Sequence, residues 1–441
     1  MAEKTVVLYP SLGVGHLNPM VQLAKAFLRR GVAVTIAVVD PPGKDPVLEA
    51  AVTRLASASP SIAVHLLPIQ PASTNEQYSN TALRMLDELR LASPVLREFL
   101  RSLPAVDAIV LDMFCVDALD VAAELAVPAY MFYASAAADL AIYLQVPDIF
   151  RAAPFSFKDM GDTALPFSGV PPLRVAGVES RQSSSGMASG RVPAAAPTPQ
   201  IYCIGPLVDG GVSGQGGERH ACLEWLDRQP KESVVFLCFG SGGVFSAAQL
   251  REMASGLENS GHRFLWAVRS PREEQSKSGE PDLEALLPDG FLQRTGDRGL
   301  VLKNWAPQAE VLRHEAVGAF VTHCGWNSAL EAVMSGVPMI CWPLYAEQRL
   351  NKIHLVEEMK IGVAVEGYEE SSVKAEEVHA KVRLVMESEE GQKLRERAAM
   401  AKEMAAEAIK EGGSSDVAFY AFLNHVEDEQ SRGAPNPAIN K

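Results

Sequence analysis

The stretch over residues 305–348 constrains the fold of this chain more than any other part. It contains two apolar runs with β-branched residues, at 317–322 and 337–342, which are typical of buried strands. Between them lie a polar loop and a segment over residues 329–334 that is predicted to be helical and to end at Gly336. The order strand, loop, helix, strand indicates one βαβ unit of a parallel sheet.

The start of the predicted helix is a candidate ligand site. Ligands of open α/β sheets bind outside the carboxyl ends of the strands, and Asn327 and Ser328 lie there. The N–H groups and positive dipole end of a helix start suit a phosphate. Ser328 and Glu331 also fit a capping box, so a simple helix cap is the alternative interpretation. Four further side chains near the same strand ends favour a ligand site, although core packing could explain the tryptophans: Trp305, His323, Trp326 and Gln348.

The whole of residues 305–348, WAPQAEVLRHEAVGAFVTHCGWNSALEAVMSGVPMICWPLYAEQ, resembles without a gap the signature of plant UDP-sugar-dependent glycosyltransferases of secondary metabolism. The roles that this resemblance implies are chemically sensible, since an aromatic plate suits a flat base and neutral hydrogen-bond donors suit phosphate oxygens. They are uracil binding by Trp305 and the Ala306 backbone, ribose binding by Gln308 and Glu331, diphosphate binding by Ser241, His323, Asn327 and Ser328, and sugar binding by Trp326, Glu347 and Gln348.

Length and composition limit the remaining possibilities. A chain of 441 residues is too long for one hydrophobic core, so we expect two domains. The net charge of −14 speaks against a nucleic-acid partner. The six cysteines are scattered without metal-binding spacing, which predicts buried free thiols in a reducing cytoplasm. Residues 1–10 lack the apolar region of a secretory signal, and residues 126–144 are too interrupted to span a membrane. We expect a cytoplasmic monomer.

The amino terminus predicts a second βαβ unit. A strand over residues 5–9 is followed by a loop, and Asn18 is the expected N-cap of a helix that begins at Pro19. The next strand covers residues 32–38, and this opening is typical of a doubly wound sheet. The loop is not a dinucleotide fingerprint, because Asn18 stands where the third glycine should be. A dehydrogenase on the same type of fold is therefore not supported.

His16 is the candidate catalytic base. It lies in the loop before the predicted helix, whose N-terminus should keep the imidazole neutral and able to accept a proton. A lone loop histidine can also be a bystander, but Asp112 ends a buried strand over residues 108–111 and faces the same crevice. An aspartate there can hold the other ring nitrogen. Asp117 and Asp120 are alternatives expected to face solvent, and the family resemblance favours His16 with Asp112.

The middle of the chain departs from the family. We predict a helix over residues 74–103 with a break at Pro94, and a buried aromatic strand over 129–135. Residues 180–199 are rich in Ser, Gly, Ala and Pro and are predicted to be flexible. The family normally has a further helix, strand and N-S-x-x-x-L-E-like motif before the interdomain linker. These are absent, so we expect part of the first domain to be replaced or missing near residues 173–199.

The resemblance implies the GT-B fold, an α/β fold in which two Rossmann-like doubly wound parallel-sheet domains face a cleft. The expected parts are an acceptor-binding domain at 1–205, a linker at 206–217, a UDP-sugar-binding domain at 218–413 and a helix at 414–428 that packs back on the first domain. A glycine-rich turn at 240–243 follows the first strand of the second domain and lets the backbone approach a diphosphate.

The expected function is inverting transfer of a sugar, most simply glucose, from a UDP-sugar to a hydroxyl of a small apolar acceptor such as a flavonoid-like phenolic. His16 takes the acceptor proton and Asp112 orients it. The residues call for no metal and no cofactor, since UDP-glucose is a co-substrate. The alternative, suggested by the missing segment, is a catalytically impaired or inactive UDP-sugar-binding protein.

Overall fold

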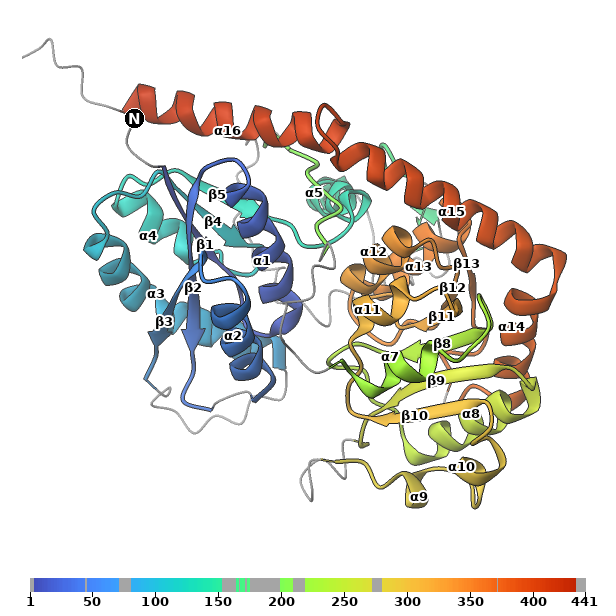
Figure 1. The fold of residues 1–441 in the computed structure, drawn as a ribbon. Coiled ribbons are helices and arrows are strands. Elements are labelled where there is room, and N and C mark those ends of the chain that lie inside the picture. The colour runs from blue at the N-terminus through green and yellow to red at the C-terminus, as the bar shows by residue number, and fades with distance from the viewer. Residues whose placement is uncertain are drawn as a thin grey trace, which may run out of the picture. The chain divides into compact units, whose positions relative to one another are not determined.

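The computed structural model describes residues 4–43, 46–70, 81–152, 164–165, 167–170, 173–174, 199–208, 219–271, 280–370 and 372–433. The chain divides into two compact units (Figure 1). Unit 1 comprises residues 1–207 with 409–441, and unit 2 comprises residues 208–408. No helix in the described part of the chain has both the length and the apolar composition needed to cross a membrane.

Unit 1 is built on a five-stranded parallel sheet of order β3-β2-β1-β4-β5. The chain adds β2 and β3 on one side of β1 and then adds β4 and β5 on the other side, so the strand order reverses between β1 and β4. The described elements are β1 (Thr5–Tyr9), α1 (Val14–Leu28), β2 (Ala33–Asp40), α2 (Pro46–Ala58), β3 (Ala63–Pro68), α3 (Thr81–Ser102), β4 (Ala108–Asp112), α4 (Ala118–Glu124), β5 (Ala129–Phe132), α5 (Ala137–Ala152), the short pair β6 (Ala164–Leu165) and β7 (Leu173–Arg174), and α16 (Ser414–Gly433).

Unit 2 has a six-stranded parallel sheet of order β10-β9-β8-β11-β12-β13. The order in which the chain adds strands reverses between β8 and β11. Its elements are α7 (Ala221–Leu226), β8 (Val234–Cys238), α8 (Ala247–Ser260), β9 (Arg263–Val268), α9 (Leu283–Leu286), α10 (Phe291–Arg294), β10 (Gly299–Lys303), α11 (Gln308–Arg313), β11 (Val317–Thr322), α12 (Trp326–Ser335), β12 (Met339–Cys341), α13 (Gln348–Ile353), the π-helix η3 (His354–Glu358), β13 (Gly362–Ala364), α14 (Ala375–Glu387) and α15 (Glu389–Ile409).

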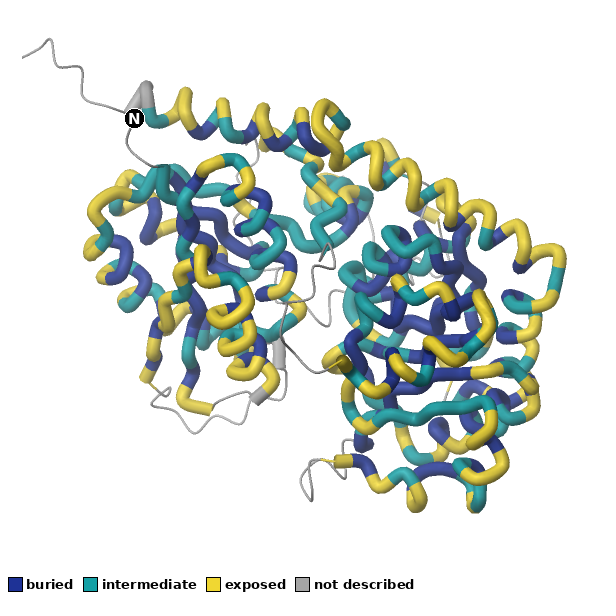
Figure 2. Tube along the Cα trace, in the orientation of Figure 1, coloured by how far each residue is buried: buried dark blue, intermediate teal, exposed yellow. Residues whose placement is uncertain are grey.

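The central strands of both sheets are buried on both faces, as their unbroken apolar sequences predict (Figure 2). In unit 1 the last helix, α16, completes one side of the core. The ring of Phe419 lies 5.1 Å from that of Phe27, and Phe422 lies edge-on to Tyr130 at 4.9 Å. Arg30 stacks over Phe419, 4.3 Å from the ring centroid. The amphipathic character of α16 is therefore explained by its packing on this unit.

The helix α1 begins earlier than predicted, at Val14 rather than Pro19. The N-cap is Gly13, whose φ of 95° is open to glycine and whose carbonyl accepts the N–H of His16 at 3.2 Å. Pro19 lies inside the helix, where its missing N–H removes one bond of the second turn. The prediction that Asn18 caps the helix is wrong, and His16 lies in the first helical turn instead of in a loop.

The predicted break at Pro94 is also wrong, because α3 continues through it. Leu89, Ala92, Leu96 and Phe99 form the buried face of this helix against the sheet, and their burial outweighs the loss of one backbone hydrogen bond. The first part of that predicted helix, residues 74–80, lies outside the described residues, as do most of the residues expected to mark the gap, 175–198.

The strand β5 is only half-buried, whereas the sequence predicts a buried strand at 129–135. Met131 is 44% exposed. The physical reason is its place in the sheet: β5 is the last strand of the described order, so β4 alone pairs with it. The apolar, aromatic composition of residues 129–135 does not distinguish an edge strand from a central one.

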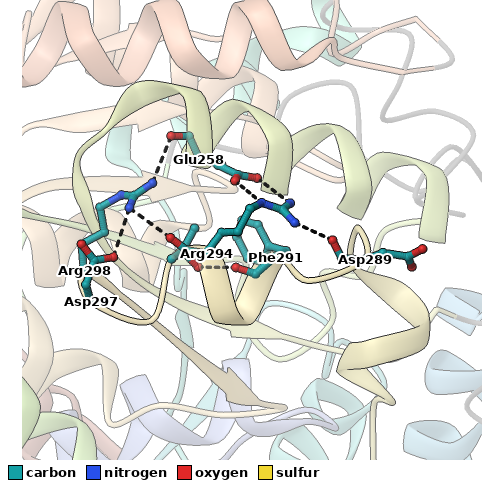
Figure 3. Close-up of polar contacts among 7 residues, drawn as sticks. Glu258, Asp289, Phe291, Arg294, Asp297 and Arg298 are labelled. Carbon is teal, nitrogen blue, oxygen red and sulfur yellow. Dashed lines mark hydrogen bonds and ion pairs between the residues drawn. The ribbon is translucent and has the colours of Figure 1, made fainter.

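A cluster of ion pairs in unit 2 anchors the segment that leads into β10 (Figure 3). Arg294 at the end of α10 binds Glu258 of α8 through two hydrogen bonds of 2.6 and 3.0 Å, and it also donates to the Asp289 carbonyl at 2.6 Å. Arg298 donates to the Glu258 carbonyl at 3.4 Å. Since β10 follows directly, this cluster helps to fix the strand that ends next to Trp305.

The cluster predicts a pH-dependent contribution to stability. The Arg294 guanidinium holds the pKa of Glu258 below its ordinary value, chiefly through their hydrogen bonds. A carboxylate with a lowered pKa stabilises the fold above its unfolded-state pKa, and the contribution is lost as pH falls through the lowered value. Glu258→Gln should therefore lower the unfolding temperature near neutral pH and lose this effect in acid. The exposed Glu389→Gln controls for net charge, and an equal pH dependence in both variants would contradict the assignment.

Candidate active site

The sugar-donor residues predicted from the sequence lie at the carboxyl ends of four strands of the unit 2 sheet. The end of β8 pairs with the end of β11, with Cys238 opposite Thr322, at the point where the strand order reverses. Such a reversal is where open α/β sheets bind ligands. Ser241 follows β8; Trp305, Ala306 and Gln308 follow β10; His323, Trp326, Asn327, Ser328 and Glu331 follow β11; Glu347 and Gln348 follow β12.

His323 is packed against the backbone of two glycines at this reversal. A Cβ on Gly240 would lie 2.7 Å from its Cε1 and Nε2, and a Cβ on Gly325 would lie 2.4 Å from Nε2. No other residue type fits these positions without moving the ring. Burial lowers the pKa of His323 to about 4, so its imidazole is neutral at physiological pH. A neutral imidazole can donate one hydrogen bond to a phosphate oxygen.

The start of α12 carries no side-chain cap. Its N-cap is Gly325, and the capping-box interpretation is wrong. The Oε2 of Glu331 accepts a hydrogen bond from Gln308 Nε2 at 2.8 Å. The same Nε2 donates to the Ser328 hydroxyl oxygen at 2.9 Å, which leaves the Ser328 proton able to face a ligand. Chemically, such a helix start can bind an anion, and a carboxylate beside an amide can bind neighbouring hydroxyls.

The two tryptophans of the stretch differ. Trp305 is 51% exposed, with its ring 5.8 Å from that of His220 in an edge-to-face arrangement, so core packing does not explain it. An exposed aromatic plate of this kind suits a flat base. Trp326 is partly buried and packs against the apolar core of unit 2, so core packing accounts for much of its side chain. Ala306 is buried, next to the exposed plate.

Gln348 is more constrained than the sequence indicates. Its side chain is buried, and its Oε1 accepts the backbone N–H groups of Leu344 at 2.8 Å and Tyr345 at 3.0 Å. Only Nε2 can therefore serve a sugar hydroxyl. Glu347 is the N-cap residue of the same helix. The Tyr345 hydroxyl lies against Gly242, where a Cβ would approach it to 2.6 Å, so this loop and the loop of Ser241 are neighbours.

In unit 1 the structure brings His16 and Asp112 together. His16 lies in the helix after β1, and Asp112 is the last residue of β4, which pairs with β1 up to Tyr9 and Leu111. His16 Nδ1 lies 2.9 Å from Asp112 Oδ2, and Asp112 is fully buried. The other carboxylate oxygen accepts the N–H of Phe114 at 3.1 Å, so the carboxylate is held in place. This is the geometry that orients a histidine base through one nitrogen and leaves proton transfer to Nε2.

The alternative carboxylates, Asp117 and Asp120, are exposed, as expected from the sequence. Sequence reasoning did not single out Phe114, whose ring lies edge-on to His16 at 5.3 Å and 79°. Its position two residues after Asp112 is the signal that could have identified it. Among the described residues, no group of three or more His, Cys, Asp or Glu side chains gathers as metal ligands would. All six cysteines are free, with Cys115, Cys222, Cys324 and Cys341 buried as predicted.

Comparison with known proteins agrees with this geometry. Residues 198–393 match the family described as UDP-glucoronosyl and UDP-glucosyl transferase. The chain is 40% identical to the anthocyanidin 5,3-O-glucosyltransferase of a Rosa hybrid cultivar, over 94% of this chain and 97% of that one. A UDP-glucosyltransferase of Polygonum tinctorium, solved with 3,4-dichloroaniline, superposes with a TM-score of 0.84 at 32% identity, covering 97% and 99% of the two chains. UGT2 of Phytolacca americana, solved with UDP-2fluoro-glucose and pterostilbene, gives 0.80 at 29% identity, covering 96% and 99%.

The two parallel-sheet α/β units, with their likeness to solved UDP-glucosyltransferases, identify the fold as GT-B. The chain belongs to the plant UDP-glycosyltransferase family and is a UDP-glycosyltransferase.

The comparison also shows that the chain is shorter than its relative. The alignment with the rose enzyme spans 466 residues, whereas 94% of this chain is about 415 of its 441 residues, so about 50 positions of that alignment have no residue here. The sheet of unit 1 ends, in the described residues, at the half-buried strand β5.

Proposed function

We propose that this protein transfers glucose from UDP-glucose to a hydroxyl of a small phenolic, flavonoid-like acceptor, with inversion at the anomeric carbon. The observation that carries the proposal is the His16–Asp112 pair, with its 2.9 Å contact and fully buried carboxylate. The acceptor class is supported by the named substrate of the rose relative and by the pterostilbene in the Phytolacca structure. Residues 70–150 of unit 1 are the proposed source of the acceptor pocket.

In the proposed reaction, His16 Nε2 takes the proton of the acceptor hydroxyl while its oxygen attacks the anomeric carbon. The bond from that carbon to the diphosphate oxygen breaks in the same step, so the configuration inverts and UDP leaves. The proton ends on His16, and the buried Asp112 carboxylate at Nδ1 stabilises the imidazolium. A positioned base of this kind contributes roughly 10²–10⁴-fold to the rate.

The departing diphosphate meets hydrogen-bond donors instead of charged side chains in the proposed site. His323 is neutral, the Ser328 proton can face the ligand, and the uncapped start of α12 adds the positive end of its dipole. We propose that these groups, with Ser241 and Asn327, stabilise the charge that develops on the leaving group and that no metal ion or organic cofactor is needed. The free cysteines support a cytoplasmic location.

The proposal is tested by incubating the protein with a panel of UDP-sugars and phenolic acceptors and reading the products by mass. We expect a mass increase of one hexose on phenolic acceptors with UDP-glucose. Transfer only to non-phenolic acceptors, or only from other sugar nucleotides, would contradict the substrate assignment.

Gln348 predicts the choice of sugar. The resemblance associates glutamine at this position with glucose, and the structure leaves only its Nε2 for a sugar hydroxyl, because Oε1 is bound by two backbone N–H groups. We therefore expect UDP-glucose to give a higher kcat/KM than UDP-galactose. The difference should be modest, roughly 2- to 10-fold, because a single neutral hydrogen bond is worth about 0.5–1.5 kcal/mol net. Equal or faster turnover of UDP-galactose would show that Gln348 does not set the preference.

A second candidate function rests on a separate observation. About 50 positions of the rose enzyme have no counterpart here, and the unit 1 sheet ends at a strand that is half exposed. If the absent residues belong next to β5, as the sequence indicates for the region near 173–199, the acceptor side is incomplete. The chain would then bind UDP-glucose and transfer the sugar slowly or not at all.

A further inference from the structure

The loop between β11 and α12 contains a residue in an unfavourable backbone conformation. Cys324, the residue between His323 and Gly325, has a φ of 64°, in the left-handed region that non-glycine residues rarely adopt. Residues in such conformations persist where neighbouring groups hold them, and they cluster at functional sites. The direction of this peptide determines where the His323 ring and the first N–H groups of α12 point.

A side chain from another element holds this peptide. Asn351 of α13 is fully buried, and its Nδ2 donates to the carbonyl oxygen of Cys324 at 2.9 Å. On the other side of the residue, the N–H of Cys324 donates to the Thr322 hydroxyl at 3.2 Å. Because a carbonyl oxygen only accepts, the amide of Asn351 supplies a donor that aspartate or leucine at this position lacks.

We infer that Asn351 is a positioning residue for the sugar donor: it holds Cys324 in the left-handed conformation and thereby keeps His323 and the start of α12 directed at the diphosphate. This inference rests on the proposed function, since it needs a diphosphate at that site. Asn351 touches the loop backbone and acts on the ligand through His323 and α12.

The position of Asn351 on α13 strengthens the inference. Gln348, three residues earlier on the same helix, holds the backbone of Leu344 and Tyr345 after β12. Residues three apart on a helix lie on one face, so α13 uses one face to fix the loops that follow β11 and β12. The sugar end and the diphosphate end of the site are thus held by one short helix.

The test compares Asn351→Leu with a matched control in the same unit. Gln249 of α8 is also a buried amide that holds backbone, since its Nε2 donates to the Val373 carbonyl at 2.9 Å and its Oε1 accepts the Val373 N–H at 2.8 Å. Gln249→Leu therefore removes a comparable buried interaction that holds Val373 instead of the loop between β11 and α12. Both variants are measured for unfolding temperature, for UDP affinity by calorimetry, and for the KM of UDP-glucose and of a phenolic acceptor.

We expect both variants to unfold at lower temperature than the unmodified chain. Only Asn351→Leu should weaken UDP binding, by about 10-fold or more, and raise the KM for UDP-glucose without raising that for the acceptor. This size follows from misdirecting one or two charge-assisted hydrogen bonds to the diphosphate. UDP affinity unchanged in Asn351→Leu, or lowered equally in Gln249→Leu, would overturn the inference.

A second variant covers the case in which Asn351→Leu does not fold. Thr322→Val is nearly isosteric and removes the acceptor of the Cys324 N–H, in the peptide on the other side of Cys324. It should weaken UDP binding in the same direction, by less, and an unchanged UDP affinity would count against the inference. If the unmodified chain itself fails to bind UDP, the proposed function and this inference fall together. If the unmodified chain binds UDP and neither substitution lowers the affinity, only the inference about Asn351 is overturned.

Discussion

Replacing His16 with alanine should lower kcat by about 10²-fold or more while leaving UDP affinity nearly unchanged. The imidazole and its partner Asp112 belong to unit 1, whereas the residues predicted to bind UDP follow the strands of unit 2. Loss of the base should therefore affect chemistry without affecting nucleotide binding. The measurement is kcat with UDP-glucose and a phenolic acceptor, together with UDP affinity by calorimetry.

Asp112→Asn should reproduce part of this loss, because the amide no longer stabilises the imidazolium. A more acidic phenol as acceptor should narrow the gap between His16→Ala and the unmodified enzyme, since it needs less help to lose its proton. If His16→Ala keeps the kcat of the unmodified chain, or loses activity only because UDP no longer binds, His16 is not the base.

The second large effect concerns the shortened first unit. Each large side chain that unit 1 fails to bury forfeits roughly 1.5–3 kcal/mol, and a domain has only about 5–15 kcal/mol in total. We therefore expect the chain to bind UDP, to unfold at higher temperature with UDP present, and to transfer glucose slowly. Inserting the corresponding passage of the rose relative, about 50 residues, between residues 173 and 199 should raise kcat at least 10-fold, as expected when an acceptor is held in a reactive geometry.

The control for this graft is an insertion of equal length made of glycine and serine, which supplies no apolar surface. It should leave kcat at the level of the unmodified chain. An unmodified chain as active as the grafted one would show that the residues present already form an adequate acceptor wall, and that the apparent gap has no functional consequence.

The arrangement of the active site was largely predictable from the sequence because it follows from sheet topology. Apolar runs identify the strands, and parallel strands place their carboxyl ends at one edge. That logic brought Ser241, Trp305 and His323 to one edge of the unit 2 sheet, and it placed His16 beside Asp112 in unit 1. The order of elements predicts these positions, whereas the donor-binding roles of Ser241, Trp305 and His323 come from the family resemblance and stay predictions.

The predictions that were wrong concern places where two local sequence signals compete, or where a distant residue overrides a local signal. Asn18-Pro19 is a good helix start, but Gly13 with its positive φ begins α1 earlier and places His16 in the first turn. Ser328 and Glu331 match a capping box, but Gln308, far away in sequence, binds both side chains. A local pattern could not reveal a partner contributed by another strand end.

Contacts between residues far apart in the sequence could not be predicted either, because a local pattern does not reveal its partner. The requirement for Gly240 and Gly325 comes from the ring of His323, and the left-handed Cys324 is held by Asn351 of α13. Neither glycine nor asparagine carries a periodic signal that identifies its partner. Likewise, the composition of β5 gave no sign that it would be an edge strand with Met131 exposed.

We propose that His16, oriented by Asp112, acts as the base in a single inverting displacement at the anomeric carbon of UDP-glucose. The most direct test is the configuration of the product, read from the coupling constant of its anomeric proton by NMR after incubation with UDP-α-glucose and a phenolic acceptor. We expect a β-glucoside from the unmodified chain, formed slowly, and at least 10²-fold less of it in the same time from His16→Ala. An α-glucoside, or a β-glucoside formed at the same rate without His16, would contradict it.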